Sequence, residues 1–163
     1  MEVNPSVANT LTPVSLPRGE GAEEILDGTV ALVGNEPILL SELLSRYALA
    51  KKLAPGITQA QVLQTMINRV LLLREARKIF PPTMSDEQAV REFTDFRIKA
   101  FVVVREEEAR DYYEKNRAKM GNAPYEQVRG RIESILGAKE MNKRLADYIQ
   151  ALRQKADIRV FLR

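Results

Sequence analysis

Residues 112–136 have the sequence YYEKNRAKMGNAPYEQVRGRIESIL, and they decide the fold. The segment predicts the end of one helix, a turn over 121–124 and the start of a much longer helix, because Pro124 suits the first position of a helix. Beyond Pro124, apolar residues recur with a period near 3.6. They predict a helix over 124–155, which would be about 45 Å long. A helix of that length in a small chain acts as a strut that joins two ends of the molecule.

The ends of the folded part should meet in one small β-sheet. The sequence TVALVGNEPILL predicts a hairpin with strands over 29–34 and 37–40, since Asn35 tolerates the positive φ of a tight turn. Near the C-terminus, ADIRVFL has Ile, Val and Leu at alternate positions and predicts a strand over 156–162. Because an isolated hairpin is only marginally stable in water, we expect this strand to pair with it.

Four shorter helices are expected between the hairpin and the long helix. Residue types that favour helix N-termini define three of the starts: Ser41, then Thr58 with Gln61 as a capping box, then Ser85. The run FVVV over 101–104 is poor helix material and should interrupt the helical course. The predicted helices cover 41–53, 58–78, 85–101 and 106–119. The expected fold class is mostly α with a small β-sheet, in which an N-terminal hairpin pairs with a C-terminal strand.

The first 24 residues differ in composition from the rest. They contain three prolines and two glycines without apolar periodicity, which predicts a disordered leader over 1–24 and one folded core over 25–163. The leader lacks the positive start and apolar centre of a signal peptide. It contains four Glu and one Arg, so the net charge of +3 for the chain leaves about +6 on the core. Basic and acidic residues alternate there, which is typical of a solvated helix surface and not of a nucleic-acid-binding face.

The residue types in the chain exclude several kinds of site. There is no Cys and no His, which removes thiol nucleophiles, thiolate metal ligands and the commonest general base near neutral pH. Acidic runs such as Asp86-Glu87 and Glu106–Glu108 stand where helices begin, and carboxylates are favourable at that end of the helix dipole. We therefore expect no catalytic residue, no metal and no cofactor. No apolar run approaches the roughly 20 residues that a transmembrane helix needs.

Several segments follow one another in the order found in a known family. A valine-rich hairpin and a capped helix are predicted by ILDGTVALVGNEPILLSELLSRYALA. The next two helices are predicted by QTMINRVLLLREARK and, after it, MSDEQAVREF. The segment that leads into the turn is VREEEARDYYEKNRAKM. After the turn come a helix, PYEQVRGRIESIL, and a closing strand, LRQKADIRVFL. This order resembles the SurA-type periplasmic chaperones over nearly all of 25–163. Each segment is a weak signal alone, and the specificity lies in their order.

The chain departs from that family at the turn. Family members usually carry a parvulin-type prolyl isomerase domain there, whereas only Gly121, Asn122 and Ala123 bridge the gap here. Parvulin sites characteristically use histidines, which this chain lacks. The resemblance implies a non-enzymatic chaperone core without isomerase activity. It implies a periplasmic protein that binds unfolded or extended segments of exported proteins, and outer-membrane proteins are one client class that it suggests.

Binding of unfolded segments needs an exposed apolar surface and no catalytic residue. The predicted helices over 41–53, 58–78 and 85–101 offer large apolar side chains for a peptide-binding groove. The candidates are Leu43, Tyr47, Met66, Phe93, Phe96 and Phe101. The alternative for each of them is an ordinary place in the core.

A second function class fits the same features. The helices would then form a scaffold that binds one defined partner, or a second copy of the chain in a homodimer that exchanges an end strand or the long helix. A carboxylate-based enzyme is the least favoured interpretation, because the acidic runs are explained by helix capping. A panel of unrelated unfolded proteins separates the first two classes, since a chaperone suppresses aggregation broadly and a scaffold has one tight partner.

Overall fold

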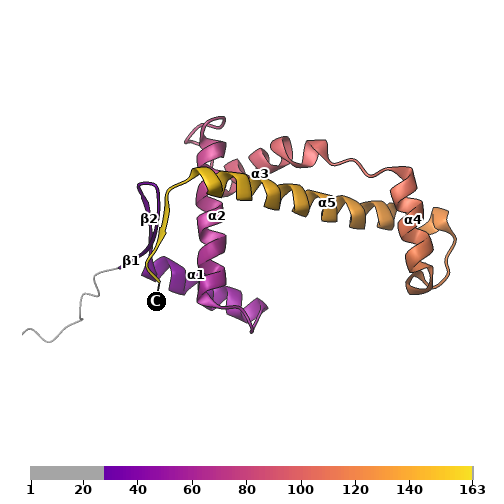
Figure 1. The fold of residues 1–163 in the computed structure, drawn as a ribbon, viewed down its shortest axis with the longest axis horizontal. Helices are drawn as coiled ribbons and strands as arrows, with labels where there is room; N and C mark the ends of the chain where they lie inside the picture. The colour runs from indigo at the N-terminus through magenta and orange to yellow at the C-terminus, as the bar shows by residue number, and fades with distance from the viewer. Residues whose placement is uncertain (1–27, 163) are drawn as a thin grey trace, which may run out of the picture.

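The computed structural model describes residues 28–162 and confirms a mostly helical fold with one small sheet. The predicted leader over 1–24 lies outside the described residues. In chain order the elements are β1 Thr29–Val33, β2 Glu36–Leu39, α1 Leu40–Leu53, α2 Gln59–Arg77, α3 Asp86–Arg97, the 3₁₀-helix η1 Lys99–Phe101, α4 Glu106–Asn116, the 3₁₀-helix η2 Arg117–Met120, α5 Tyr125–Lys155 and β3 Ile158–Val160. Figure 1 shows two lobes at opposite ends of α5. The first contains the sheet with α1, α2 and α3, and the second contains α4 and η2.

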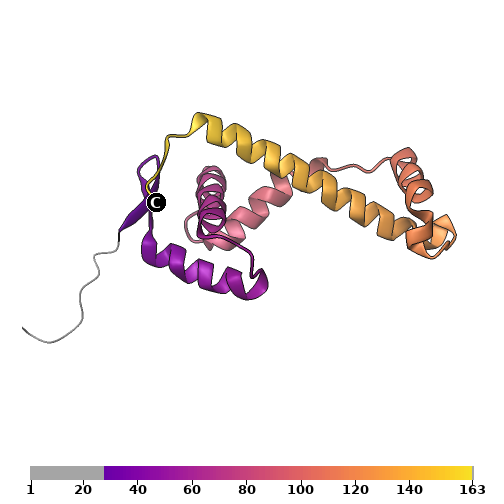
Figure 2. The ribbon, with the colours of Figure 1, turned by 60° about the horizontal axis from the view of Figure 1, so that its bottom comes forward.

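The two ends of the folded chain meet in one antiparallel sheet, as the alternating end segments predict. Its strand order is β2-β1-β3, so β1 lies in the centre. Figure 2 shows the C-terminal strand beside the N-terminal hairpin. Val33 of β1 pairs with Ile158 of β3. At the hairpin turn, the Gly34 N–H donates to the Asp157 carbonyl over 2.6 Å. The end-to-end pairing is therefore confirmed, although β3 is shorter than the predicted 156–162.

α2 is the central helix of the first lobe. Its buried residues contact the sheet and α1 in one apolar cluster and α3 in a second. The first cluster contains Val30, Ala31, Val33, Ile38, Leu43, Val62, Leu63, Met66, Ile67 and Leu71, and the second contains Leu72, Ala76, Ala89 and Phe93. The guanidinium of Arg153 on α5 donates to Asn68 and Gln64 of α2 over 2.7 and 2.6 Å. These hydrogen bonds fix the last turns of α5 on the first lobe.

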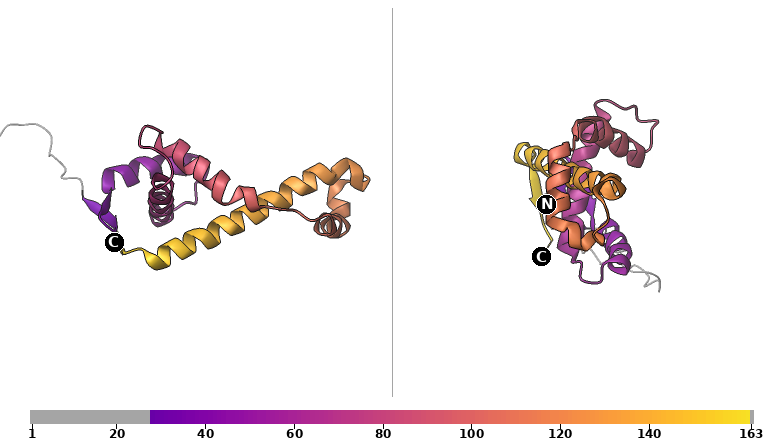
Figure 3. Two further views of the ribbon diagram at one scale, coloured as in Figure 1. Left: turned by 90° about the horizontal axis from the view of Figure 1, so that it is seen from above. Right: turned by 90° about the vertical axis from the view of Figure 1, so that its right-hand side faces the viewer.

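α5 takes part in the cores of both lobes. Its first half contributes Tyr125, Val128, Ile132 and Leu136 to a third cluster with α4, and its last turns pack Leu145, Tyr148, Ile149 and Leu152 on the first lobe. Residues 137–144, GAKEMNKR, belong to none of these clusters, and we call them the neck of α5. Within the described part of the chain, the neck and the segment 102–105 connect the lobes (Figure 3). The single apolar face expected for 124–155 therefore serves two separate cores.

The turn between α4 and α5 packs into the core of the second lobe. Gly121 and Asn122 both have left-handed φ values, of 65° and 55°. The Tyr113 hydroxyl donates to the Ala123 carbonyl over 2.9 Å, and the Tyr113 ring meets the Tyr125 ring edge-on with centroids 5.5 Å apart. The short bridge thus joins the two helices directly.

The start of α1 differs from the prediction. The N-cap is Leu39, which makes no side-chain capping hydrogen bond, so the prediction that Ser41 caps this helix is wrong. The physical reason is that β2 runs straight into α1. The Leu40 N–H donates to the Gly28 carbonyl over 2.8 Å, so the sheet supplies a partner that a capping side chain would otherwise provide. The capping box of Thr58 and Gln61 at α2 is present as predicted.

Two other helices are shorter than predicted. α3 ends at Arg97 and not at residue 101, because η1 takes over before the valine run. α4 ends at Asn116 and continues as η2 up to the turn. The break expected over 101–104 is confirmed, since residues 102–105 are neither helix nor strand. Among residues 28–162 no helix combines the length and the apolar character that crossing a membrane requires.

Candidate functional site

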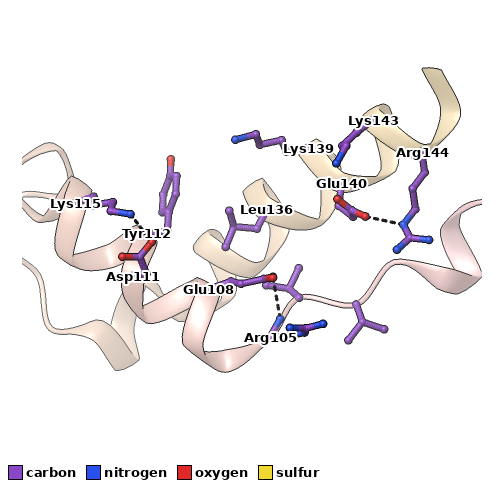
Figure 4. Close-up of a pocket in the computed structure, with 12 residues that line it drawn as sticks. Arg105, Glu108, Asp111, Tyr112, Lys115, Leu136, Lys139, Glu140, Lys143 and Arg144 are labelled. Atoms are coloured by element: carbon purple, nitrogen blue, oxygen red, sulfur yellow. Dashed lines mark hydrogen bonds and ion pairs between the residues drawn. The ribbon is translucent and has the colours of Figure 1, made fainter. Parts of the chain in front are cut away.

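A cleft lies between the two lobes, where α4, the segment 102–105 and the neck of α5 meet. Its volume is about 750 Å³. Figure 4 shows α5 along one side of it, and α4 and the segment 102–105 along the other. The lining residues are Val103, Val104, Arg105, Glu108, Asp111, Tyr112, Lys115, Leu136, Lys139, Glu140, Lys143 and Arg144. We call this opening the inter-lobe cleft.

The segment 102–105 gives the cleft an extended edge. Valines are poor helix formers, and Val102 has extended dihedrals of −80° and 115°. The segment passes over Gly137, where a Cβ would lie 3.8 Å from Val104 Cγ2. The N–H groups of Val103 and Val104 donate no hydrogen bond within residues 28–162. Another extended chain could therefore hydrogen-bond to this backbone in the manner of an added strand.

Apolar side chains form the floor of the cleft. Val104, Leu136 and the Tyr112 ring pack on the core of the second lobe and also line the opening. Tyr112 is therefore only half-buried. Val103 belongs to no core cluster and its surface is 73 % exposed. Its side chain is available to a ligand without any rearrangement of the lobes.

Two ion pairs neutralise part of the rim. Lys115 pairs with Asp111 on α4 over 2.6 Å, and Arg144 pairs with Glu140 on α5 over 2.7 Å. Both are exposed pairs one helical turn apart, which contribute only a few tenths of a kcal/mol each. Eight charged residues line the rim, and the charges of these four cancel in pairs.

The remaining charges at the rim are mostly positive. Arg105, Lys139 and Lys143 form no ion pair with any residue in 28–162. The Glu108 carboxylate accepts a hydrogen bond from the Arg105 backbone N–H over 3.4 Å, as an acid at the start of α4 should. Three unpaired cations therefore face one acid, and the cleft carries an excess of positive charge.

Shifted pKa values occur at described residues outside the cleft. Glu87, at the start of α3, has a lowered pKa, because its carboxylate accepts a hydrogen bond from its own backbone N–H and interacts with the Arg69 guanidinium. Burial and the neighbouring Glu106 raise the pKa of Tyr125 in the second lobe. Both groups have a structural explanation, so neither indicates acid–base chemistry.

The six predicted binding residues separate into core and surface. Leu43, Met66 and Phe93 are buried in the first lobe, and Tyr47 is half-buried against the first cluster. Phe96 and Phe101 are 64 % and 60 % exposed at the end of α3 and in η1. None of the six is among the residues that line the inter-lobe cleft. The predicted set is therefore not brought together in one groove.

A smaller hollow lies between α1 and α2. Its volume is about 280 Å³ and its lining is mainly apolar. Met66 is the one predicted binding residue at its wall, beside Leu49, Ala50, Ile57 and Val62. Arg46 and Arg69 stand at the same hollow, but each is already paired with an acid, Glu42 and Glu87 respectively.

The sequence did contain one signal for the inter-lobe cleft. The apolar periodicity of α5 weakens between Leu136 and Leu145, where only Ala138 and Met141 continue it within GAKEMNKR. Such a gap in a long amphipathic helix indicates a stretch that lies against no core. In the described part of the chain, no group of Asp and Glu side chains is arranged to hold a metal ion.

Comparison of the chain with protein-family models, with curated proteins and with solved structures gives no match.

Proposed function

We propose that the protein is a non-catalytic chaperone that binds extended segments of unfolded polypeptides in the inter-lobe cleft. The observation that carries the proposal is the edge formed by Val103 and Val104. It lies between the extended residues Val102 and Arg105, its N–H groups donate no hydrogen bond within residues 28–162, and it presents an exposed apolar side chain beside an apolar floor. These are the features that bind an unfolded segment through its main chain, whatever its sequence.

The order of elements supports the same function. The hairpin, the four shorter helices, the long helix and the closing strand follow the order that resembles SurA-type periplasmic chaperones. The tight turn over 121–124 leaves no residues for an isomerase domain, and the chain has no His. We therefore propose client binding without prolyl isomerisation. The periplasmic location and the exported clients belong to this proposal.

The expected affinity suits a protein that must release its clients. Burial of one Val, Leu or Phe side chain contributes roughly 1.5–3 kcal/mol before ordering costs. Two or three such contacts, reduced by the cost of ordering a client, give affinities of about micromolar strength. Phe96 and Phe101 provide further exposed apolar surface on the chain leading to the cleft.

Suppression of aggregation by the Val103→Ser variant tests the proposal. Val103 is exposed, so the melting temperature should be unchanged, while the loss of one apolar contact should weaken suppression about fivefold. Leu53→Ser is the matched control, because Leu53 is 91 % exposed at the end of α1, far from the cleft. Unrelated unfolded proteins should all respond in the same way.

Two results would reject the proposed function. One is equal suppression of aggregation by the wild type and both variants, which would show that clients do not bind at Val103 in the cleft. The other is a single client that binds tightly while the rest of the panel is ignored, which would favour the scaffold function.

A further inference from the structure

The inter-lobe cleft contains a like-charge pair on one helical face. Lys139 and Lys143 lie one turn apart in the neck of α5 and both line the cleft. Several other charged pairs at this spacing on α4 and α5 join opposite charges, as in Arg110–Glu106 and Arg129–Glu133, whereas Glu107 and Asp111 on α4 also carry like charge. Like charges at this spacing destabilise a helix slightly, and an anionic group between them would remove the repulsion.

We propose that the cleft selects extended segments in which acidic side chains alternate with apolar ones. This inference rests on the proposed function and names its client class. The unpaired cations Arg105, Lys139 and Lys143 supply the complementary charge, and Val103, Val104 and Leu136 supply the apolar surface.

The spacing of the lysines fits an extended client. Side chains one helical turn apart have Cβ atoms about 5–6 Å apart. Alternate residues of an extended chain are separated by about 6.6 Å and point to the same side. Two carboxylates at alternate positions therefore match Lys139 and Lys143, while the residues between them point to the opposite side. In Figure 4, α4 and the segment 102–105 lie across the cleft from α5.

The position of the charges favours an acidic client over a neutral one of equal apolarity. Both lysines are exposed, so each attraction is weak and is screened by salt. Their combined effect should be a preference of about 3- to 10-fold for the acidic segment at low ionic strength. Selectivity should fall at high salt, while binding through the apolar floor and the backbone should persist.

The test is a fluorescence-anisotropy titration of the full chain with three labelled peptides of equal length. All three have the same Leu and Phe at alternate positions, and the positions between them are Glu, Gln or Lys. The wild type should bind the Glu peptide most tightly and the Lys peptide least. The double variant Lys139→Gln/Lys143→Gln should lose the preference for the Glu peptide over the Gln peptide.

A matched control removes the same charge elsewhere. Lys52→Gln/Lys155→Gln replaces two exposed lysines of the first lobe that form no ion pair within residues 28–162. This variant should retain the wild-type order of affinities, which separates a local effect of the cleft from a change in net charge. Circular dichroism should give the same melting curve for both double variants.

The failure of this inference is distinguishable from failure of the proposed function. Equal binding of all three peptides, weakened throughout by Val103→Ser, would reject the acidic preference and leave client binding intact. Binding of none of the peptides would reject both.

Residues 1–24 carry a net charge of about −3, so an unlabelled peptide of that sequence is included as a competitor. If it displaces the labelled Glu peptide more strongly than the unlabelled Glu peptide does, the cleft holds the N-terminal segment of the chain and the inference fails.

Discussion

Gly121 and Gly130 stand in similar open surroundings but in opposite backbone conformations. A Cβ at either position would meet no atom within 4 Å. Gly121 has a φ of 65°, in the left-handed region that costs other residues roughly 1–2 kcal/mol. Gly130 lies inside α5, where the lack of a side chain destabilises a helix by about 0.5–1 kcal/mol. Conformation, and not space, therefore decides the effect of a methyl group at each position.

Alanine substitutions at these two glycines should act in opposite directions. Gly121→Ala should lower the free energy of unfolding by about 1–2 kcal/mol, because the turn needs a left-handed residue. Gly130→Ala should raise it by about 0.5–1 kcal/mol, because alanine favours the helix. Urea denaturation followed by circular dichroism measures both changes. Stabilisation by Gly121→Ala would mean that the turn does not hold this conformation.

At the scale of elements, α3 shows how phenylalanines of one helix divide between core and surface. Phe93 is buried and its ring lies 5.9 Å from that of Tyr148 on α5, whereas Phe96 projects from the same helix into solvent. The two residues are three positions apart, which the sequence alone assigns to one apolar stripe. The positions of α2 and α5 decide which of them is covered.

Phe93→Ala and Phe96→Ala should therefore separate clearly in stability. The first removes a buried aromatic side chain and should cost about 3–5 kcal/mol. The second should change stability by no more than about 0.5 kcal/mol, because Phe96 is mostly exposed. Thermal unfolding provides the measurement, and equal losses would show that Phe96 is part of the core.

The closing strand offers a second comparison within one element. Ile158 packs against the first cluster and pairs with Val33, while Val160 is 47 % exposed at the end of β3. Ile158→Ser should cost about 1–3 kcal/mol and lower the melting temperature by several degrees. Val160→Ser should cost less than about 0.5 kcal/mol. If Val160→Ser is as damaging as Ile158→Ser, the strand lies against the core with a different register.

The elements were predictable where local rules act alone. Thr58 and Gln61 define a helix start, Pro124 precedes another, and alternation identifies the strands, because these signals depend on neighbours in sequence. The prediction that Ser41 caps α1 was wrong, because β2 runs directly into α1 and the Leu40 N–H donates to the Gly28 carbonyl instead. The inter-lobe cleft could not be foreseen in detail, because two stretches separated in sequence, 103–115 and 136–144, line it, and its lysines resemble those of an ordinary solvated helix face.

At the scale of the whole molecule, the division of α5 between two cores explains the cleft. Each end of the helix is covered by a lobe, and the neck over 137–144 is covered by neither. The segment 102–105 runs beside the neck and cannot pair its backbone with it, because α5 satisfies its own hydrogen bonds. The result is an open edge with apolar and basic side chains, held between two folded bodies.

Hydrogen–deuterium exchange of the full chain, with and without an unfolded client, tests most directly whether clients bind at this edge. The N–H groups of Val103 and Val104 donate no hydrogen bond within residues 28–162, so they should exchange rapidly in the free protein. A saturating client should slow exchange over 102–105 and leave α1 unchanged. Protection confined to the hollow between α1 and α2, or no change over 102–105 despite saturation, would contradict client binding in the inter-lobe cleft.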